Sequence, residues 1–173
     1  MRHDILRNNK ELFGIIGAIF AFALITLIYF CPVLQGKRIK QHDIEMYKGA
    51  SQEIREYRES TGEQTLWTNS MFGGGPAWNI SVKPQGNLTM PIYKALSLGF
   101  PHPIGSVFVC MLGFFVLLLV LDCSLWISFI GAIAYGFTSY LFIVIGAGHN
   151  SKAWAMAYMA PVLAGVLLTY KGK

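Results

Sequence analysis

Four long runs of apolar residues alternate with polar segments along the chain. The runs cover residues 12–34, 104–121, 125–147 and 153–170, and none of them contains Asp, Glu, Lys, Arg or His. They are 23, 18, 23 and 18 residues long, whereas a helix needs roughly 17–25 apolar residues to cross a bilayer. The pattern therefore predicts an all-α membrane protein with four transmembrane helices.

The polar segments predict how the chain is threaded through the membrane. Residues 1–11 form a polar head, residues 35–103 form a long loop, and short turns join the last three runs. Basic residues gather at both ends of the chain: Arg2, Arg7, Lys10, Lys171 and Lys173. Because four spans place both ends on one side, the positive-inside rule predicts a cytoplasmic N-terminus and an outward-facing 35–103 loop. The same parity puts Asp43 and the 148–152 turn on one membrane face.

The long loop begins with a helical pattern over residues 43–60. At 100° per residue, one arc of this helix carries Asp43, Met46, Tyr47, Ala50, Ile54 and Tyr57. We expect an amphipathic helix that lies on the membrane or on the spans and stops at Gly62. Pro91 suits a first helical position, so a second surface helix is expected before residue 104.

Asp43 stands on the apolar arc of the expected helix, where a carboxylate needs a partner, a cleft or solvent. One interpretation makes it a catalytic acid–base residue or a metal ligand. The other makes it the N-cap of the helix, because aspartate is a favoured capping residue. Both interpretations stay open, and they are compatible.

Residues 65–81 combine aromatic, amide and hydroxyl side chains with three glycines, Gly73–Gly75. Trp67, Asn69 and Trp78 could contact a sugar, whose C–H face stacks on an aromatic ring while its hydroxyls bind amides. The alternative is a flexible loop whose tryptophans rest in the interfacial belt of the membrane.

The turn at residues 148–152 reads Gly-His-Asn-Ser-Lys and comes directly before the fourth run. A helix start carries free amides and partial positive charge, and Lys152 and His149 add donors. This combination predicts a phosphate site at the membrane surface. The alternative is an ordinary polar turn with a lysine that reaches toward the interface.

Composition and charge exclude several classes of function. The chain is 54% hydrophobic and 13% charged with a net charge of +5, but its basic residues flank the runs or alternate with acids. A nucleic-acid partner is therefore not expected. The three cysteines are odd in number and lack metal-ligand spacing, which favours a packing role.

Two stretches, QHDIEMYKGASQEIREYRESTGEQTLWTNSMFGGGPAW and GAGHNSKAWAMAYMAPVLAG, resemble the YfhO family of bacterial integral membrane proteins. That family is similar to the C-type glycosyltransferases, so the resemblance implies the N-terminal part of such a fold in the bacterial inner membrane. It implies Asp43 as the acid of the first outer loop, and His149 and Lys152 as a Gly-His-x-x-Lys element. Gly75 and Trp78 depart from the family pattern, where a methionine and a tyrosine are expected.

The resemblance also implies a substrate and a partner. Family members are implicated in moving sugars from polyprenyl-phosphate donors to cell-envelope polymers outside the membrane. Because they are several times longer, the chain is expected to be an N-terminal fragment that is inactive alone. The resemblance implies no particular cofactor. The alternative role of Asp43 is to bind a divalent metal.

Three other functions compete with the glycosyltransferase. Four spans with surface helices would also suit a non-catalytic scaffold or membrane subunit. A transporter ranks lowest, because ion and proton carriers place ionisable groups within their spans and these runs have none. A flippase for lipid-linked substrates is harder to separate from the main hypothesis.

Overall fold

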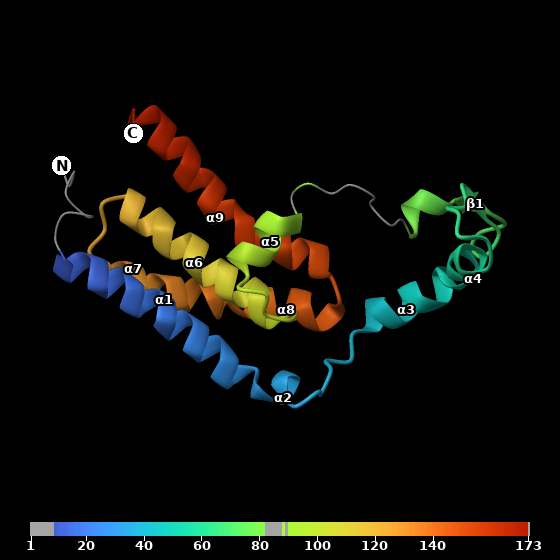
Figure 1. Ribbon diagram of the computed structural model, residues 1–173, viewed down its shortest axis with the longest axis horizontal. Helices are drawn as coiled ribbons and strands as arrows, with labels where there is room; N and C mark the ends of the chain where they lie inside the picture. The colour runs from blue at the N-terminus through green and yellow to red at the C-terminus, as the bar shows by residue number, and fades with distance from the viewer. Residues whose placement is uncertain (1–8, 82–87, 89, 173) are drawn as a thin grey trace. The chain divides into compact units, whose positions relative to one another are not determined.

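The computed structural model describes residues 9–81, 88 and 90–172. The chain divides into two compact units. The helical unit comprises Met1–Ile39 and Pro91–Lys173, and the small unit comprises Lys40–Met90 (Figure 1). Each unit has its own packing.

The helical unit is built around α6 (Ile104–Val120), which contacts α1 (Asn9–Tyr29), α7 (Leu125–Gly136) and α9 (Asn150–Tyr170). Three further helices complete the unit: α2 (Cys31–Leu34), α5 (Met90–Leu96) and α8 (Ser139–Ala147). Most of the side chains of α6 are buried by these neighbours. A helix that is apolar all round is expected to be enclosed in this way, either by protein or by lipid.

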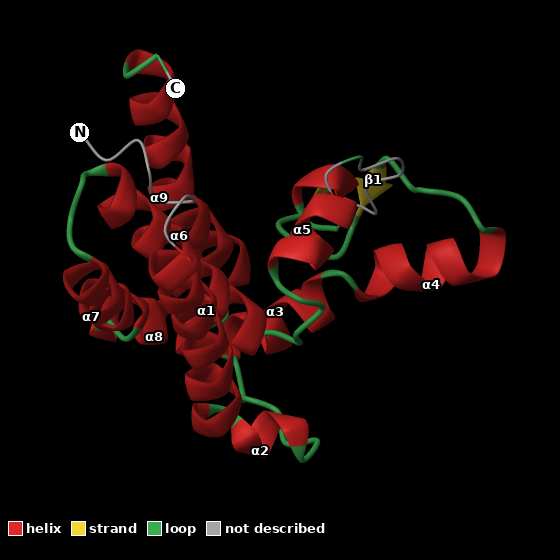
Figure 2. Ribbon diagram, turned by 60° about the vertical axis from the view of Figure 1, so that its left-hand side comes forward, coloured by secondary structure: helices red, strands yellow, loops and turns green. Residues whose placement is uncertain are grey.

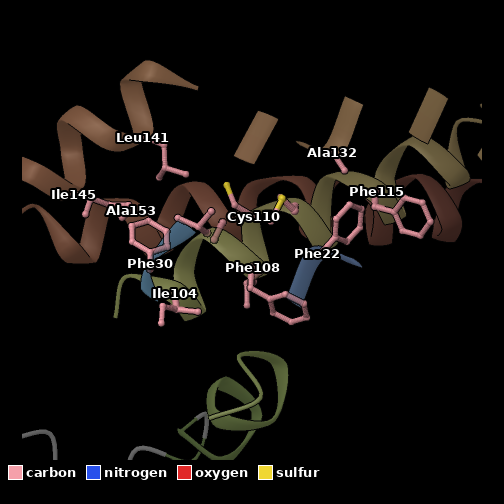
Figure 3. Packing of buried hydrophobic residues seen from close by; sticks show 14 of the residues in the cluster. Phe22, Phe30, Ile104, Phe108, Cys110, Phe115, Ala132, Leu141, Ile145 and Ala153 are labelled. Carbon is pink, nitrogen blue, oxygen red and sulfur yellow. The ribbon is translucent and has the colours of Figure 1, made fainter. Parts of the chain in front are cut away.

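Aromatic rings from three helices form the centre of this core. The ring of Phe22 on α1 meets Phe115 on α6 edge-on, with 5.4 Å between centroids, and stacks on Phe129 of α7 at 5.3 Å. Figure 3 shows the rings of Phe22 and Phe115 side by side. Edge-on and stacked pairs of this kind contribute about 0.5–1.5 kcal/mol beyond the area that they bury.

Glycines set how closely the helices approach. A Cβ added to Gly113 on α6 would lie 2.5 Å from the Pro161 ring and 3.1 Å from the Ala157 carbonyl oxygen of α9. A Cβ added to Gly136, at the end of α7, would lie 2.2 Å from Met111. Small residues are the usual means by which membrane helices bring their backbones together.

Three helical segments are long and apolar enough to cross a membrane: Asn9–Tyr29, Leu125–Ala147 and Asn150–Tyr170. The remaining predicted span, the second run, forms α6 with 17 residues, which corresponds to about 25 Å of helix against a hydrocarbon core of about 30 Å. The chain is thus a mostly helical membrane protein. The four-span threading, and the shared face of Asp43 and the 148–152 turn that depends on it, stay predictions.

The apolar runs differ from the helices that they form in three places. The first run is broken after Tyr29, and Pro32 lies in the first turn of the separate α2. The third run is divided between α7 and α8 at Phe137 and Thr138. The last helix begins at Asn150, three residues before the fourth run, because polar residues are well tolerated in the first turn of a helix.

The small unit contains α3 (His42–Ala50), α4 (Gln52–Thr61), the strands β1 (Trp67–Thr68) and β2 (Gly75–Pro76), and a 3-10 turn, η1 (Ala77–Asn79). The strands pair antiparallel, with Trp67 opposite Pro76; β1 is marked in yellow in Figure 2. The buried apolar side chains of α4 and η1 are Ile54 and Ala77. Such a small apolar core needs polar contacts to hold it.

The prediction of one helix over residues 43–60 was wrong in one respect. Two helices meet at Ser51, where φ is −95° and ψ is 4°. Gly49 and Ser51 have low helix propensity, which explains the break at this point. Gly62 ends α4 in the left-handed conformation, as expected. The predicted apolar arc is only partly buried, since Met46 and Tyr57 are exposed.

The second predicted surface helix is present as α5, with Pro91 as its second residue. Proline is well tolerated in the first turn of a helix because the amide it lacks would have no partner there. The prediction of a short helix before residue 104 is therefore confirmed, while its position on the membrane surface stays a prediction.

We expect Gly113→Ala to destabilise the helical unit by about 1–3 kcal/mol, because the added methyl group overpacks the α6–α9 contact. The midpoint of SDS-induced unfolding in mixed micelles would measure this loss. Gly165→Ala on α9 is the matched control, since a Cβ there meets no atom within 4 Å. Equal midpoints for Gly113→Ala and the control would contradict the close packing.

Candidate functional site

The first candidate site is the junction between α8 and α9. Gly148 ends α8 in the left-handed conformation, with a φ of 104°. The amides of Gly148 and His149 donate to the carbonyl oxygens of Ile145 and Val144, at 3.2 and 3.1 Å. His149 is then the N-cap of α9, and Asn150 is the first residue of that helix. The glycine allows the chain to reverse without strain, so the start of α9 directly follows the end of α8.

Lys152 occupies the first turn of α9, where the helix dipole places a partial positive charge. No acidic side chain in this turn offsets that charge. Its ammonium nitrogen lies 5.1 Å from the centroid of the Tyr140 ring, a cation–π contact worth about 0.5–1 kcal/mol when exposed. The side chain of His149 is exposed and does not cap the helix. The junction therefore gathers positive potential at a helix start, and an anion would be favoured there.

His102 adds a second imidazole to this junction, from the segment before α6. Burial lowers the pKa of His102, and a hydrogen bond with the side chain of Asn150 opposes this shift. Both ring nitrogens are enclosed, and neither makes a hydrogen bond of good geometry among the described residues. The ring is therefore neutral near pH 7, so it could offer a donor or an acceptor but no charge. No local pattern connects it with a residue 48 positions away.

The second candidate site lies in the small unit and is organised by Glu53. Its carboxylate accepts hydrogen bonds from the Thr68 hydroxyl, the Asn69 amide at 2.8 Å and the Asn69 side chain at 3.4 Å. The hydrogen bond from Thr68, followed by that from the Asn69 amide, holds the pKa of Glu53 below its ordinary value of 4.5. This carboxylate thus fastens β1 to α4.

Trp67 and Asn69 come together on the outer side of this arrangement. The indole nitrogen of Trp67 donates to the side-chain oxygen of Asn69 at 3.2 Å, and the Trp67 residue as a whole is 53% exposed. The Asn69 amide keeps one N–H and one lone pair for a ligand. An exposed ring beside an oriented amide can stack on a sugar and hydrogen-bond to its hydroxyls.

Trp78 does not join this pair. It lies in η1 and is 57% exposed, but no ring contact links it with Trp67 within the described part of the chain. The structure therefore joins Trp67 and Asn69 by a hydrogen bond and shows no such contact between this pair and Trp78 among the described residues.

Asp43 is the second residue of α3, and Gln41 is the N-cap. The capping interpretation of Asp43 was therefore wrong, although an acid in the first turn still suits the helix dipole. Asp43 is half-buried. Its neighbour Glu45 pairs with Lys48 at 2.7 Å, and this hydrogen bond and charge lower the pKa of Glu45.

The described residues contain no cluster of side chains suited to hold a metal ion. No three His, Cys, Asp or Glu side chains within 9–81 and 90–172 lie close enough together to hold an ion.

Comparisons of this chain with protein-family models, with curated proteins and with solved structures gave no match. The resemblance to the YfhO family stays a prediction that depends on the two stretches quoted above.

We expect the small unit to loosen in acid because of Glu53. A carboxyl group whose pKa is lowered by folding stabilises the fold above its ordinary value, and this contribution is lost as the pH falls below 4.5 through the lowered value. Hydrogen-exchange protection of β1, corrected for intrinsic exchange rates, would fall over that range. In Glu53→Gln it would be low and independent of pH.

Glu59→Gln is the control for this experiment, since Glu59 lies exposed on the same helix. It should keep the pH dependence of the unmodified chain. Loss of the dependence in both variants would show that Glu53 is not its source.

Proposed function

We propose that the chain is the N-terminal part of a membrane glycosyltransferase that moves a sugar from a polyprenyl-phosphate donor to a cell-envelope acceptor. The observation that carries this proposal is the α8–α9 junction. It combines a left-handed glycine, a helix start and Lys152, with no acidic residue in the first turn of α9. Phosphate is the anion that such a combination suits best.

The position of the junction along the chain supports a phosphate that belongs to a lipid. Leu125–Ala147 and Asn150–Tyr170 are both long enough to cross a membrane. A turn of two residues between two such segments lies at a membrane surface. A polyprenyl phosphate has its headgroup at the same level, because its tail is confined to the hydrocarbon core.

The small unit would supply contacts to the sugar. Trp67 and Asn69 offer an aromatic face and an oriented amide, and Glu53 keeps them in place. Trp78 would then contact the acceptor or a second part of the sugar.

The proposed reaction assigns a separate role to each charged residue. A hydroxyl of the acceptor forms a bond to the anomeric carbon while the bond from that carbon to the phosphate oxygen breaks. Asp43 takes the hydroxyl proton as general base. The phosphate leaves with the electron pair, and Lys152 and the start of α9 stabilise its growing charge. These roles for Asp43 and Lys152 require the four-span threading, which would place both residues on the outer face of the membrane.

We expect Lys152→Gln to weaken binding of a polyprenyl phosphate about tenfold, because one charge-assisted hydrogen bond is lost. Binding would be measured with the chain in nanodiscs. Lys171→Gln is the matched control, since Lys171 follows α9 at its other end and binds Asp122 at 3.1 Å and the Val120 carbonyl at 2.7 Å. Unchanged affinity in Lys152→Gln would remove the phosphate site.

We expect Asp43→Asn to lower sugar transfer by about 10²–10⁴-fold in the complete protein, while membrane insertion persists, because a general base contributes that much. Transfer of radiolabelled sugar from the lipid donor would measure it. Glu45→Gln, two residues away, should keep nearly full activity. If neither the unmodified protein nor its variants transfer sugar while donor binding is intact, a non-catalytic subunit is the better assignment.

A further inference from the structure

The reversal between β1 and β2 presents an unusual residue at its tip. The amide of Gly74 donates to the carbonyl oxygen of Met71 at 2.8 Å. The two residues between them, Phe72 and Gly73, have φ values of 52° and 77°. Two positive φ values in the centre of a hydrogen-bonded turn are typical of the type I′ turn, which normally carries Asn, Asp or Gly.

Phenylalanine at this position opposes the local backbone preference. A bulky side chain in the left-handed region is strained, and such strain persists where the surroundings or a function maintain it. Folding does not recover the cost by burying the ring, because Phe72 is 98% exposed. Its ring contacts no other aromatic ring among the described residues.

The turn is nevertheless held firmly from below. A Cβ on Gly74 would lie 2.8 Å from the Trp67 ring, so the indole packs directly on the turn backbone. Trp67 is in turn fixed by Asn69, and Asn69 by Glu53. The small unit thus displays Phe72 on a supported turn, and Leu66, beside β1, is 73% exposed as well.

We propose that Phe72 and Leu66 enter the lipid–water interface and anchor the small unit to the membrane. The transfer of aromatic and aliphatic side chains from water to this interface is favourable in free energy. The strained backbone of Phe72 is then explained by what the ring contacts in a bilayer. This inference goes beyond the proposed glycosyl transfer and does not depend on it.

Chain connections argue for lipid as the occupant. The residues between α2 and α3 number seven, 35–41, and can extend at most about 25 Å. They join the small unit to α1, which is apolar and long enough to cross a membrane. Lys37, Arg38 and Lys40 in this link are exposed and would attract anionic headgroups. A bilayer is therefore always within reach of the small unit.

Quenching of a fluorescent amino acid would test the contact directly. Dansylalanine would replace Phe72, or Glu59 as the control position, in the full chain in nanodiscs. We expect doxyl-labelled lipid to quench position 72 at least threefold more than position 59, and aqueous iodide to quench position 59 more. Equal iodide quenching at both positions without lipid quenching would overturn the proposal. Protection of position 72 from both quenchers would also overturn it, since protein would then cover the ring.

A second variant tests the role of Phe72 without harming the fold. Asparagine adopts the left-handed region with little strain, so Phe72→Asn keeps the turn while removing the ring. With dansylalanine at position 66, we expect Phe72→Asn to lower lipid quenching at least twofold and Phe72→Trp to preserve it. Unchanged quenching at position 66 in Phe72→Asn would show that the ring is not the anchor.

Discussion

Close backbone contact at glycine positions is the constraint on which the helical unit depends. Within lipid, helices gain little stability by burying apolar side chains against one another, because the lipid tails are apolar as well. Close van der Waals contact between the helices has to stabilise the unit instead. Gly113 lets α6 approach Pro161 of α9, and Gly136 accommodates Met111. Because α6 is enclosed by α1, α7 and α9, these contacts set how closely α7 and α9 approach it.

The small unit is held together by different forces. It buries few large apolar side chains, Ile54 being the main one, and relies on polar contacts between segments distant in sequence. Glu53 binds Thr68 and Asn69, while Arg58 donates to Gln64 at 2.9 Å and to the Ser81 carbonyl oxygen at 3.4 Å. A unit stabilised in this way can leave its aromatic residues on the surface, where they serve binding instead of the core.

The candidate site was predictable where its chemistry is local. Gly148, His149 and Lys152 are neighbours in the chain, so their gathering at a helix start follows from the pattern alone. Glu53 and His102 were missed, because their partners lie 15 and 48 residues away and no periodic signal connects them. Phe72 was also missed, although a bulky residue before three glycines is a turn signal that could have drawn attention.

By itself, the sequence determined that the chain is mostly helical, where its long apolar helices lie, and that Gly62 ends a helix. These features depend on residues within a few positions of one another, where side-chain periodicity and backbone freedom act. Only the tertiary structure decided the break at Ser51, the burial of α6 and the pairing of Trp67 with Asn69. Those outcomes depend on which distant surfaces meet, and the free energy of such contacts is not written in any short stretch of residues.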